Sequence, residues 1–410
     1  MNPWPVVIAD LRALRWVAWL VPALVAIAIA IGVVVSAEET ALRRASARAA
    51  DDFDLLIGAP GSLTQLVMTT VYLQPEALPL IDGAILNTLA ADPRAKAMAP
   101  VAFGDVVRGY PVVGTTVAFV SRWGRLAPNE GRIFAVEGEA VIGADVRMGI
   151  GDSMTPSHGT GGHRSAPGTE NTEEAGHRHD GVAYKIVGRL PRLGSAWDRA
   201  ILVPIESVWE THGLGNGHAS EPARLGPPFD AAKVPGVPAI VVRAGSVADA
   251  YALRGQYRQG GTVALFPAEV LTALYQSLGD VRDVLVVASV LNDVLVFASV
   301  TMLLLALAGL RRRRYAVLRA LGASRGFVLL VVWLGAMVLL LAGCIGGLAL
   351  GGFVASLASL LIEARTGLAV AVSIGWAELG NVLLLVTVGS LLSLVPAMAS
   401  FRTPVGDALR

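Results

Sequence analysis

Two long apolar segments separated by a short basic linker constrain this chain more than any other feature. Residues 284–310 and 327–351 are each long enough to cross a hydrocarbon core of ~30 Å as a helix rising ~1.5 Å per residue. The linker between them, residues 311–326, is rich in arginine. It also carries an apolar stripe formed by Val317, Leu318 and Leu321. This amphipathic pattern predicts a short helix lying at a membrane surface.

Two further apolar runs, residues 17–36 and 378–398, bring the number of predicted membrane helices to four. The first run resembles a signal peptide, but it exceeds the usual core of ~7–15 residues, so a retained helix is favoured. Arginines cluster before the first span, in the linker and after the fourth span. With four spans these positions share one side, which the positive-inside rule makes cytoplasmic. Residues 1–16, an amphipathic N-terminus, and the tail 402–410 are therefore predicted to be cytoplasmic.

The remaining long segment, residues 37–282, is predicted to lie on the opposite side of the membrane. Good helix formers in residues 37–50 predict a stalk that continues the first span. Beyond the stalk the composition is that of a soluble α+β domain. Strands are predicted at residues 112–120, 133–142, 183–187, 201–204 and 239–242. The predicted fold class is thus a membrane protein with four transmembrane helices (1+3) and a large extracytoplasmic α+β domain inserted between helices 1 and 2.

A histidine-rich insertion, residues 155–180, interrupts this domain. It lacks large apolar side chains from residue 157 onward, so it is predicted to be flexible. Imidazole and carboxylate groups in the insertion suit zinc or a similar metal. The candidate metal ligands are His158, His163, His177 and His179. A solvated insertion without any metal explains the same composition equally well.

The third apolar span carries glycines at every fourth position, namely Gly343, Gly347 and Gly351. This spacing places them on one helical face and predicts close helix packing or a dimer seam. The chain has no glycine-rich phosphate loop ending in Lys-Ser or Lys-Thr and no hydrolytic triad signature. We therefore expect no catalysis by this chain and no bound cofactor other than zinc. The nearly balanced charge gives no indication of a nucleic-acid partner.

The linker and third span, RRYAVLRALGASRGFVLLVV followed by GGLALGG, resemble FtsX-like permeases. This is the group of type VII ABC transporter subunits that includes MacB and the lipoprotein-releasing proteins. The tail VPAMASFRTPVGDALR resembles the end of the same family. The segment YKIVGRLPRLGSAWDRAILVPIESVWE resembles the MacB-like periplasmic domain in a branch with His-rich insertions.

The resemblance implies a homodimer in the bacterial inner membrane, with two copies of a separate cytoplasmic ABC ATPase that holds ATP and Mg. It further implies an FtsX-like permease domain over residues 283–401 and an outer domain in which a mixed α/β lobe, built from chain segments on either side, flanks a smaller β-rich lobe. In the family the linker is a coupling helix. If this role is carried over to the present sequence, the resemblance implies that the residues contacting the ATPase are Arg314, Leu318, Arg319, Leu321, Gly322 and Ser324. The chain departs from the family at Trp333, near a position where glutamate is common, and at Tyr315, where an acid is frequent.

The expected function is coupling of ATP hydrolysis in the partner to a conformational change of the outer domain, for export or extraction of an envelope substrate. A periplasmic adaptor or lipoprotein would be a further partner. Two alternatives remain open. One is a non-transporting regulator of a periplasmic partner, and the other is a component of zinc homeostasis.

Overall fold

The computed structural model describes residues 2–13, 15–158, 182–219, 221, 223–277, 279–373 and 375–401. The chain divides into two compact units. The helical unit comprises Met1–Arg43, Leu278–Leu361 and Val370–Arg410, and the sheet domain comprises Arg44–Ser277 and Ile362–Ala369.

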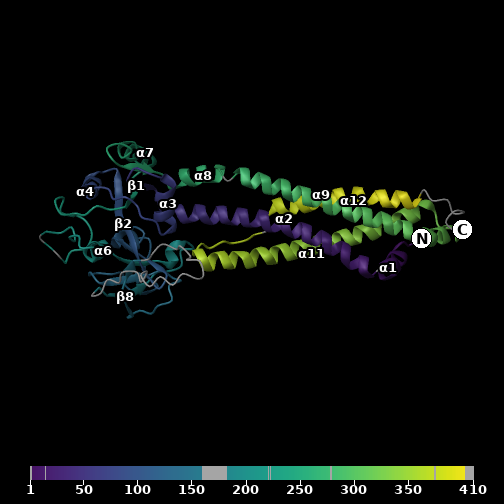
Figure 1. The fold of residues 1–410 in the computed structure, drawn as a ribbon, viewed down its shortest axis with the longest axis horizontal. Coiled ribbons are helices and arrows are strands. Elements are labelled where there is room, and N and C mark those ends of the chain that lie inside the picture. The colour runs from purple at the N-terminus through teal and green to yellow at the C-terminus, as the bar shows by residue number, and fades with distance from the viewer. Residues whose placement is uncertain are drawn as a thin grey trace, which may run out of the picture. The chain divides into compact units, whose positions relative to one another are not determined.

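Helices make up the helical unit (Figure 1): α1 (Trp4–Ala13), α2 (Arg15–Ala50), α9 (Gly279–Leu310), α10 (Arg312–Ala320), α11 (Arg325–Thr366) and α12 (Trp376–Phe401). Four of them, α2, α9, α11 and α12, are long and apolar enough to cross a membrane. One precedes the sheet domain and three follow it, so the predicted 1+3 arrangement is confirmed.

Two of the spans continue well beyond the lengths read from hydropathy. Helix α2 runs to Ala50 and so includes the stalk expected at residues 37–50. Helix α11 has 42 residues, whereas the span was predicted to end at residue 351. At ~1.5 Å per residue it is ~63 Å long, about twice the thickness of a hydrocarbon core. Gly367, with φ +74°, follows its last residue in the left-handed conformation that commonly ends helices.

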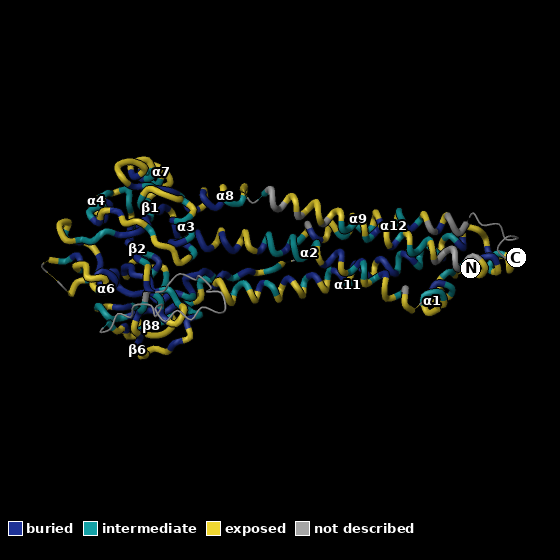
Figure 2. Tube along the Cα trace, viewed as in Figure 1, coloured by how far each residue is buried: buried dark blue, intermediate teal, exposed yellow. Residues whose placement is uncertain are grey.

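The core of the helical unit forms where α2, α9 and α11 pack together. Its buried side chains are Val21, Val25, Ile29, Val33, Phe297, Val300, Leu339, Leu340 and Cys344. Trp333 joins α11 to α12, because its indole N–H donates to the carbonyl oxygen of Ser390 at 3.3 Å. Much of α9 is exposed in this chain (Figure 2). Apolar side chains exposed on a membrane helix are free to contact lipid or another subunit.

The sheet domain contains strands β1 (Leu55–Gly58), β2 (Ala95–Val107), β3 (Tyr110–Thr115), β4 (Glu130–Gly131), β5 (Glu139–Ile142), β6 (Ser153–Met154), β7 (Ser157–His158), β8 (Tyr184–Arg189), β9 (Ile201–Pro204), β10 (Ala239–Ala244) and β11 (Val263–Leu265). Its helices are α3 (Leu63–Tyr72), α4 (Ala84–Ala91), α5 (Val117–Val120), α6 (Ile205–Thr211), α7 (Val247–Gln256) and α8 (Pro267–Ser277), with the 3-10 turn η1 (Ala196–Arg199). The predicted α+β class is confirmed.

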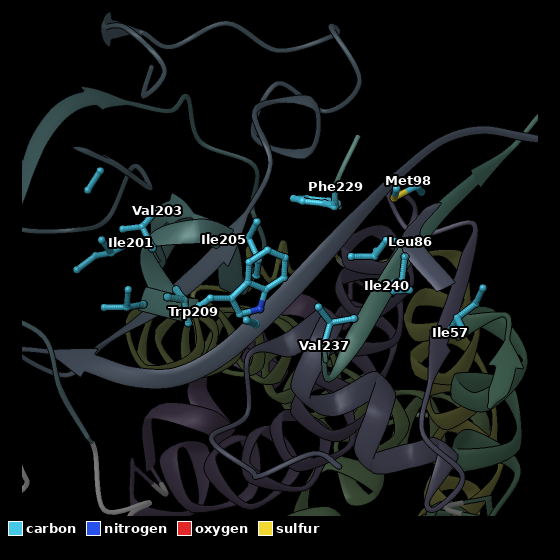
Figure 3. Close-up of a cluster of buried hydrophobic side chains, with 14 of the residues drawn as sticks. Ile57, Leu86, Met98, Ile201, Val203, Ile205, Trp209, Phe229, Val237 and Ile240 are labelled. Carbon is cyan, nitrogen blue, oxygen red and sulfur yellow. The ribbon is translucent and has the colours of Figure 1, made fainter. Parts of the chain in front are cut away.

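Strand β2 joins two parts of the sheet, whose order is β11-β1-β10-β2-β3-β9-β5-β8-β4. Its first half pairs with β10 and its second half with β3, both antiparallel. Strands β1, β10 and β11 come from the two ends of the domain sequence, whereas β3 to β9 lie between them in the chain. This is the two-part arrangement that the resemblance implied. Figure 3 shows side chains of both parts, such as Ile240 and Ile201, in one cluster of buried apolar residues.

Several strand predictions need correction. The predicted strand 112–120 ends at Thr115 and is followed by α5, and only Glu139–Ile142 of the range 133–142 is a strand. Strand β2 was missed because its sequence AKAMAPVAFGDVV contains several alanines and a proline, which are depleted in strands. Strand β1, a short apolar run, cannot be distinguished from a buried helix by periodicity.

Candidate functional site

Helix α10 is the centre of the candidate site, and a turn bounds it at each end. After α10 the chain turns at Gly322, whose φ of +98° is unfavourable for residues with a side chain. Ser324 then begins α11. Its hydroxyl oxygen accepts a hydrogen bond from the N–H of Phe327 at 3.2 Å, the contact of a helix N-cap. The linker therefore forms one short helix between two long ones, as its amphipathic pattern predicted.

One face of α10 is exposed and combines apolar side chains with arginines. Val317 is 45% exposed and the following Leu321 is 80% exposed. These positions are four residues apart, so the side chains are neighbours on one helical face. Arg313 and Arg314 are exposed in the preceding turn. The surface suits a protein partner with an apolar groove and acidic groups at its edge.

The residues assigned to ATPase contact divide into two groups. Arg314, Leu321, Gly322 and Ser324 are exposed, whereas Leu318 and Arg319 are half-buried. Leu318 packs against a small cluster formed by Val7, Ala323, Phe327 and Val331. Val317 was not assigned, although it belongs to the predicted stripe. Hydropathy alone could not decide which of the neighbours Val317 and Leu318 points inward, because both are apolar.

The inner side of α10 contacts α1. Asp10 forms an ion pair with Arg311 at 2.9 Å, and the guanidinium also donates to the Asp10 carbonyl oxygen at 2.9 Å. The hydroxyl of Tyr315 donates to the same carboxylate at 3.5 Å. Burial, together with the nearby Asp10 charge, raises the pKa of Tyr315, so the hydroxyl stays protonated. Asp10 thus brings a carboxylate to Tyr315 from a distant part of the chain.

The three glycines of α11 lie against α2. A Cβ atom added to Gly343 would lie 2.6 Å from Cβ of Val25, and one added to Gly347 would lie 2.7 Å from Cβ of Ile29. At Gly351 the corresponding distance to Cβ of Val33 is 2.9 Å. Only a residue without a side chain allows such an approach. The glycine face is therefore covered by α2 of the same chain.

The C-terminal end of α11 is bound within the sheet domain. Arg199, at the end of η1, donates from Nη1 to the carbonyl oxygens of Ala364 at 2.6 Å and Arg365 at 3.2 Å. The last carbonyls of a helix have no partner within the helix, and a positive charge there is favourable. Arg192 forms a second contact, an ion pair with Glu363 at 3.1 Å. The end of α11 therefore makes polar contacts with two arginines of this domain.

The segment after α11 also contacts the end of α2. The N–H of Ala369 donates to the carbonyl oxygen of Gly194 at 3.1 Å, and Arg48 of α2 donates to the carbonyl oxygen of Ala369 at 3.1 Å. Asp52, just beyond α2, forms ion pairs with Arg122 at 3.2 Å and Arg125 at 2.9 Å. Both long helices therefore end in polar contacts with the same domain.

The histidine prediction falls largely outside the described residues. His158 is in β7, where its backbone pairs with Asp105 of β2. His163, His177 and His179 lie in residues 159–181, which the structure does not describe. Among the residues it does describe, no group of three or more His, Cys, Asp or Glu side chains is arranged to hold a metal ion. Zinc binding by the insertion stays a prediction.

Comparisons with known proteins give a family match and several similar solved structures. Residues 286–405 match the family described as FtsX-like permease C-terminal. No curated protein matches the chain. The periplasmic region of MacB from Actinobacillus actinomycetemcomitans is 10% identical, with 56% of this chain and 95% of that chain covered and a TM-score of 0.33. The extracellular domain of the noncanonic ABC-type transporter YknZ from Gram-positive bacteria is 12% identical, with 52% and 98% covered and a TM-score of 0.29.

The family match covers nearly all of α9 together with α10, α11 and α12. It thus includes three of the four membrane helices and the exposed face of α10. The resemblance read from the linker and the tail is confirmed over this range. Residues 286–405 are therefore similar to the FtsX-like permease C-terminal family.

Proposed function

We propose that this chain is the permease subunit of an ABC transporter and that α10 receives a cytoplasmic ATPase. The observation that carries the proposal is the exposed pair Val317 and Leu321, flanked by arginines on a short helix between two spans. Exposed apolar side chains beside arginines can anchor a protein partner. A homodimer with two ATPase copies is the assembly that the family resemblance implies.

The proposed orientation places α10 and both chain termini in the cytoplasm of a bacterial inner membrane. The arginines of residues 311–314 support this orientation, since basic loops are retained on the cytoplasmic side. The sheet domain then lies outside the cytoplasm and acts on an envelope substrate or partner.

The proposed mechanism is transmission of ATPase movement to the sheet domain. Two continuous helices, α2 and α11, pass from the helical unit into the sheet domain. Their ends are bound there through Arg48 and Arg199. Movement of α10 would therefore reach the sheet domain through helical backbone rather than through a flexible loop.

The double substitution Val317→Asp/Leu321→Asp tests the proposal in the full-length chain coexpressed with its ATPase. We expect at least a tenfold loss of ATPase copurification and of permease-stimulated hydrolysis in nanodiscs, because buried apolar anchors dominate interfaces. Leu318 is a poor choice for this test, since it packs inward.

A matched control is available on α7, where Val247 and Tyr251 form another exposed apolar pair with the same spacing. Val247→Asp/Tyr251→Asp should leave ATPase binding and stimulation unchanged. Wild-type coupling in the α10 variant would contradict the proposed function.

A further inference from the structure

Helix α10 depends on its neighbours for its position. It has nine residues, its N-cap residue Arg311 makes no capping hydrogen bond through its side chain, and Gly322 ends it in a tight turn. Isolated helices shorter than ~12 residues are marginal in water. The orientation of its exposed face must therefore be fixed by contacts on its inner side.

Helix α1 makes polar contacts at the start of α10. Asp10 binds Arg311 through both its carboxylate and its carbonyl oxygen, and the carboxylate also accepts from Tyr315 one turn later. The side chains of Asp10 and Arg311 are only 17% and 16% exposed. Charge-assisted hydrogen bonds are stronger than neutral ones, and partial burial reduces their screening by salt.

The same helix makes apolar contacts beyond the end of α10. Val7, which is 1% exposed, lies in a cluster with Ala323, Phe327 and Val331, and Leu11 and Leu318 pack against this cluster. Val7 and Asp10 are three residues apart and so lie on one face of α1. One face of α1 therefore contacts the chain on both sides of α10.

We propose that α1 is a brace that positions α10, with Asp10 as its positioning residue. Asp10 holds the first turn and Val7 holds the chain after the last turn, so that Val317 and Leu321 are presented in one orientation. The consequence for ATPase coupling rests on the proposed function, whereas the bracing itself does not.

Asp10→Asn tests the brace in the full-length chain in phospholipid nanodiscs, by hydrogen–deuterium exchange of peptides covering residues 311–326. We expect the backbone amides of α10 to exchange about tenfold faster, because α10 then opens locally more often. Asp10→Glu, which keeps the charge, should restore much of the protection. Arg12→Gln, an exposed substitution on the same helix, should exchange like the wild type.

Arg311→Gln is the second variant and should accelerate exchange to the same extent. The double variant Asp10→Asn/Arg311→Gln should exchange little faster than either single variant, because both substitutions remove the same ion pair. Wild-type exchange of α10 in either single variant, or fully additive effects, would overturn the brace.

Coupling is measured separately on the same variants. With the brace released, the ATPase should still copurify through the intact Val317 and Leu321, while stimulated hydrolysis falls several-fold. If Val317→Asp/Leu321→Asp leaves hydrolysis unchanged but Asp10→Asn accelerates exchange, the brace stands and the ATPase assignment fails. If exchange does not change in Asp10→Asn, the brace fails whatever the ATPase does.

Discussion

Gly347 is the residue at which the packing of α11 on α2 is easiest to test. A Cβ atom there would meet both Cβ of Ile29 and, at 2.9 Å, the carbonyl oxygen of Ala26. The second contact is with backbone, so a side-chain movement cannot relieve it. At Gly335, on the same helix, an added Cβ would have no atom within 4 Å.

Gly347→Ala should destabilise the helical unit by about 1–3 kcal/mol, because overpacking forces the two helices apart. Gly335→Ala should be neutral or stabilising by up to ~1 kcal/mol, since alanine favours helix over glycine. Thermal unfolding of the full-length chain in detergent measures both. Equal effects of the two substitutions would show that α2 and α11 do not pack as closely as described.

Glu206 is a buried acid within the sheet domain and has few compensating contacts. It is 1% exposed, one oxygen accepts from the N–H of Gly226 at 2.7 Å, and His218 Nε2 lies 3.6 Å away. Burial raises the pKa of Glu206 to about 7, although the Gly226 N–H partly opposes this. Burial and a hydrogen bond with Glu210 also raise the pKa of Glu137.

A raised carboxyl pKa means that the folded domain binds more protons than the unfolded chain between pH 4.5 and about 7. The contribution of the protonated Glu206 carboxyl to the free energy of unfolding is therefore fully present below pH 4.5. It is lost as the pH rises to about 7. Glu206→Gln imitates the protonated carboxyl. It should make the domain more stable than the wild type at pH 8, by roughly 3 kcal/mol at most, and nearly equal to it at pH 4.5.

Denaturant unfolding of the two proteins at each pH gives this difference. Burial lowers the pKa of His218, which makes stability fall at low pH in both proteins. The exposed substitution Glu76→Gln is the control and should follow the wild type throughout. A constant difference between Glu206→Gln and the wild type across the pH range would argue against a raised pKa.

At the scale of elements, the contact of Arg199 with the end of α11 is the clearest link between a membrane helix and the sheet domain. Arg199→Ala should leave two helix carbonyls without this partner and remove a favourable charge, at a cost of about 1–3 kcal/mol. We expect faster hydrogen–deuterium exchange in residues 362–369 and weaker transmission, with ATPase binding retained.

Arg258→Ala, an exposed substitution just beyond α7, is the control for loss of a surface arginine. If residues 362–369 exchange at the same rate in Arg199→Ala and Arg258→Ala, the arginine does not hold α11 in place.

Elements were predictable where a strong local pattern decides the structure. The four spans follow from long apolar runs, and α10 follows from its amphipathic linker. The end of α11 was placed too early because its last turns carry Glu363 and Arg365, which lower hydropathy without ending a helix. The better signal was Arg365 followed by Gly367, a basic last turn and a C-terminal glycine. Strand β2 had no such signal, because pairing on both edges overrides its weak local preference.

At the scale of the whole molecule, the parts that could not be predicted are contacts between distant segments. Asp10 and Arg311 are separated by 301 residues, and Arg48 and Ala369 by 321. A single sequence shows that a carboxylate and a guanidinium exist, but nothing in their local patterns says that they meet. The positive-inside pattern and the family resemblance each depend on many residues along the chain. They can therefore be recognised from the sequence without knowledge of those long-range contacts.

The length of α11 has a mechanical consequence. One unbroken helix of 42 residues runs from the N-cap residue Ser324 to the carbonyl groups that Arg199 binds. The glycines at 343, 347 and 351 let this helix pack closely along α2. Over ~63 Å, a tilt of only ~5° about one end displaces the other by ~5 Å, about the pitch of one helical turn. Under the proposed function, a small rotation of α11 at α10 would therefore displace the far end of this helix by about one helical turn.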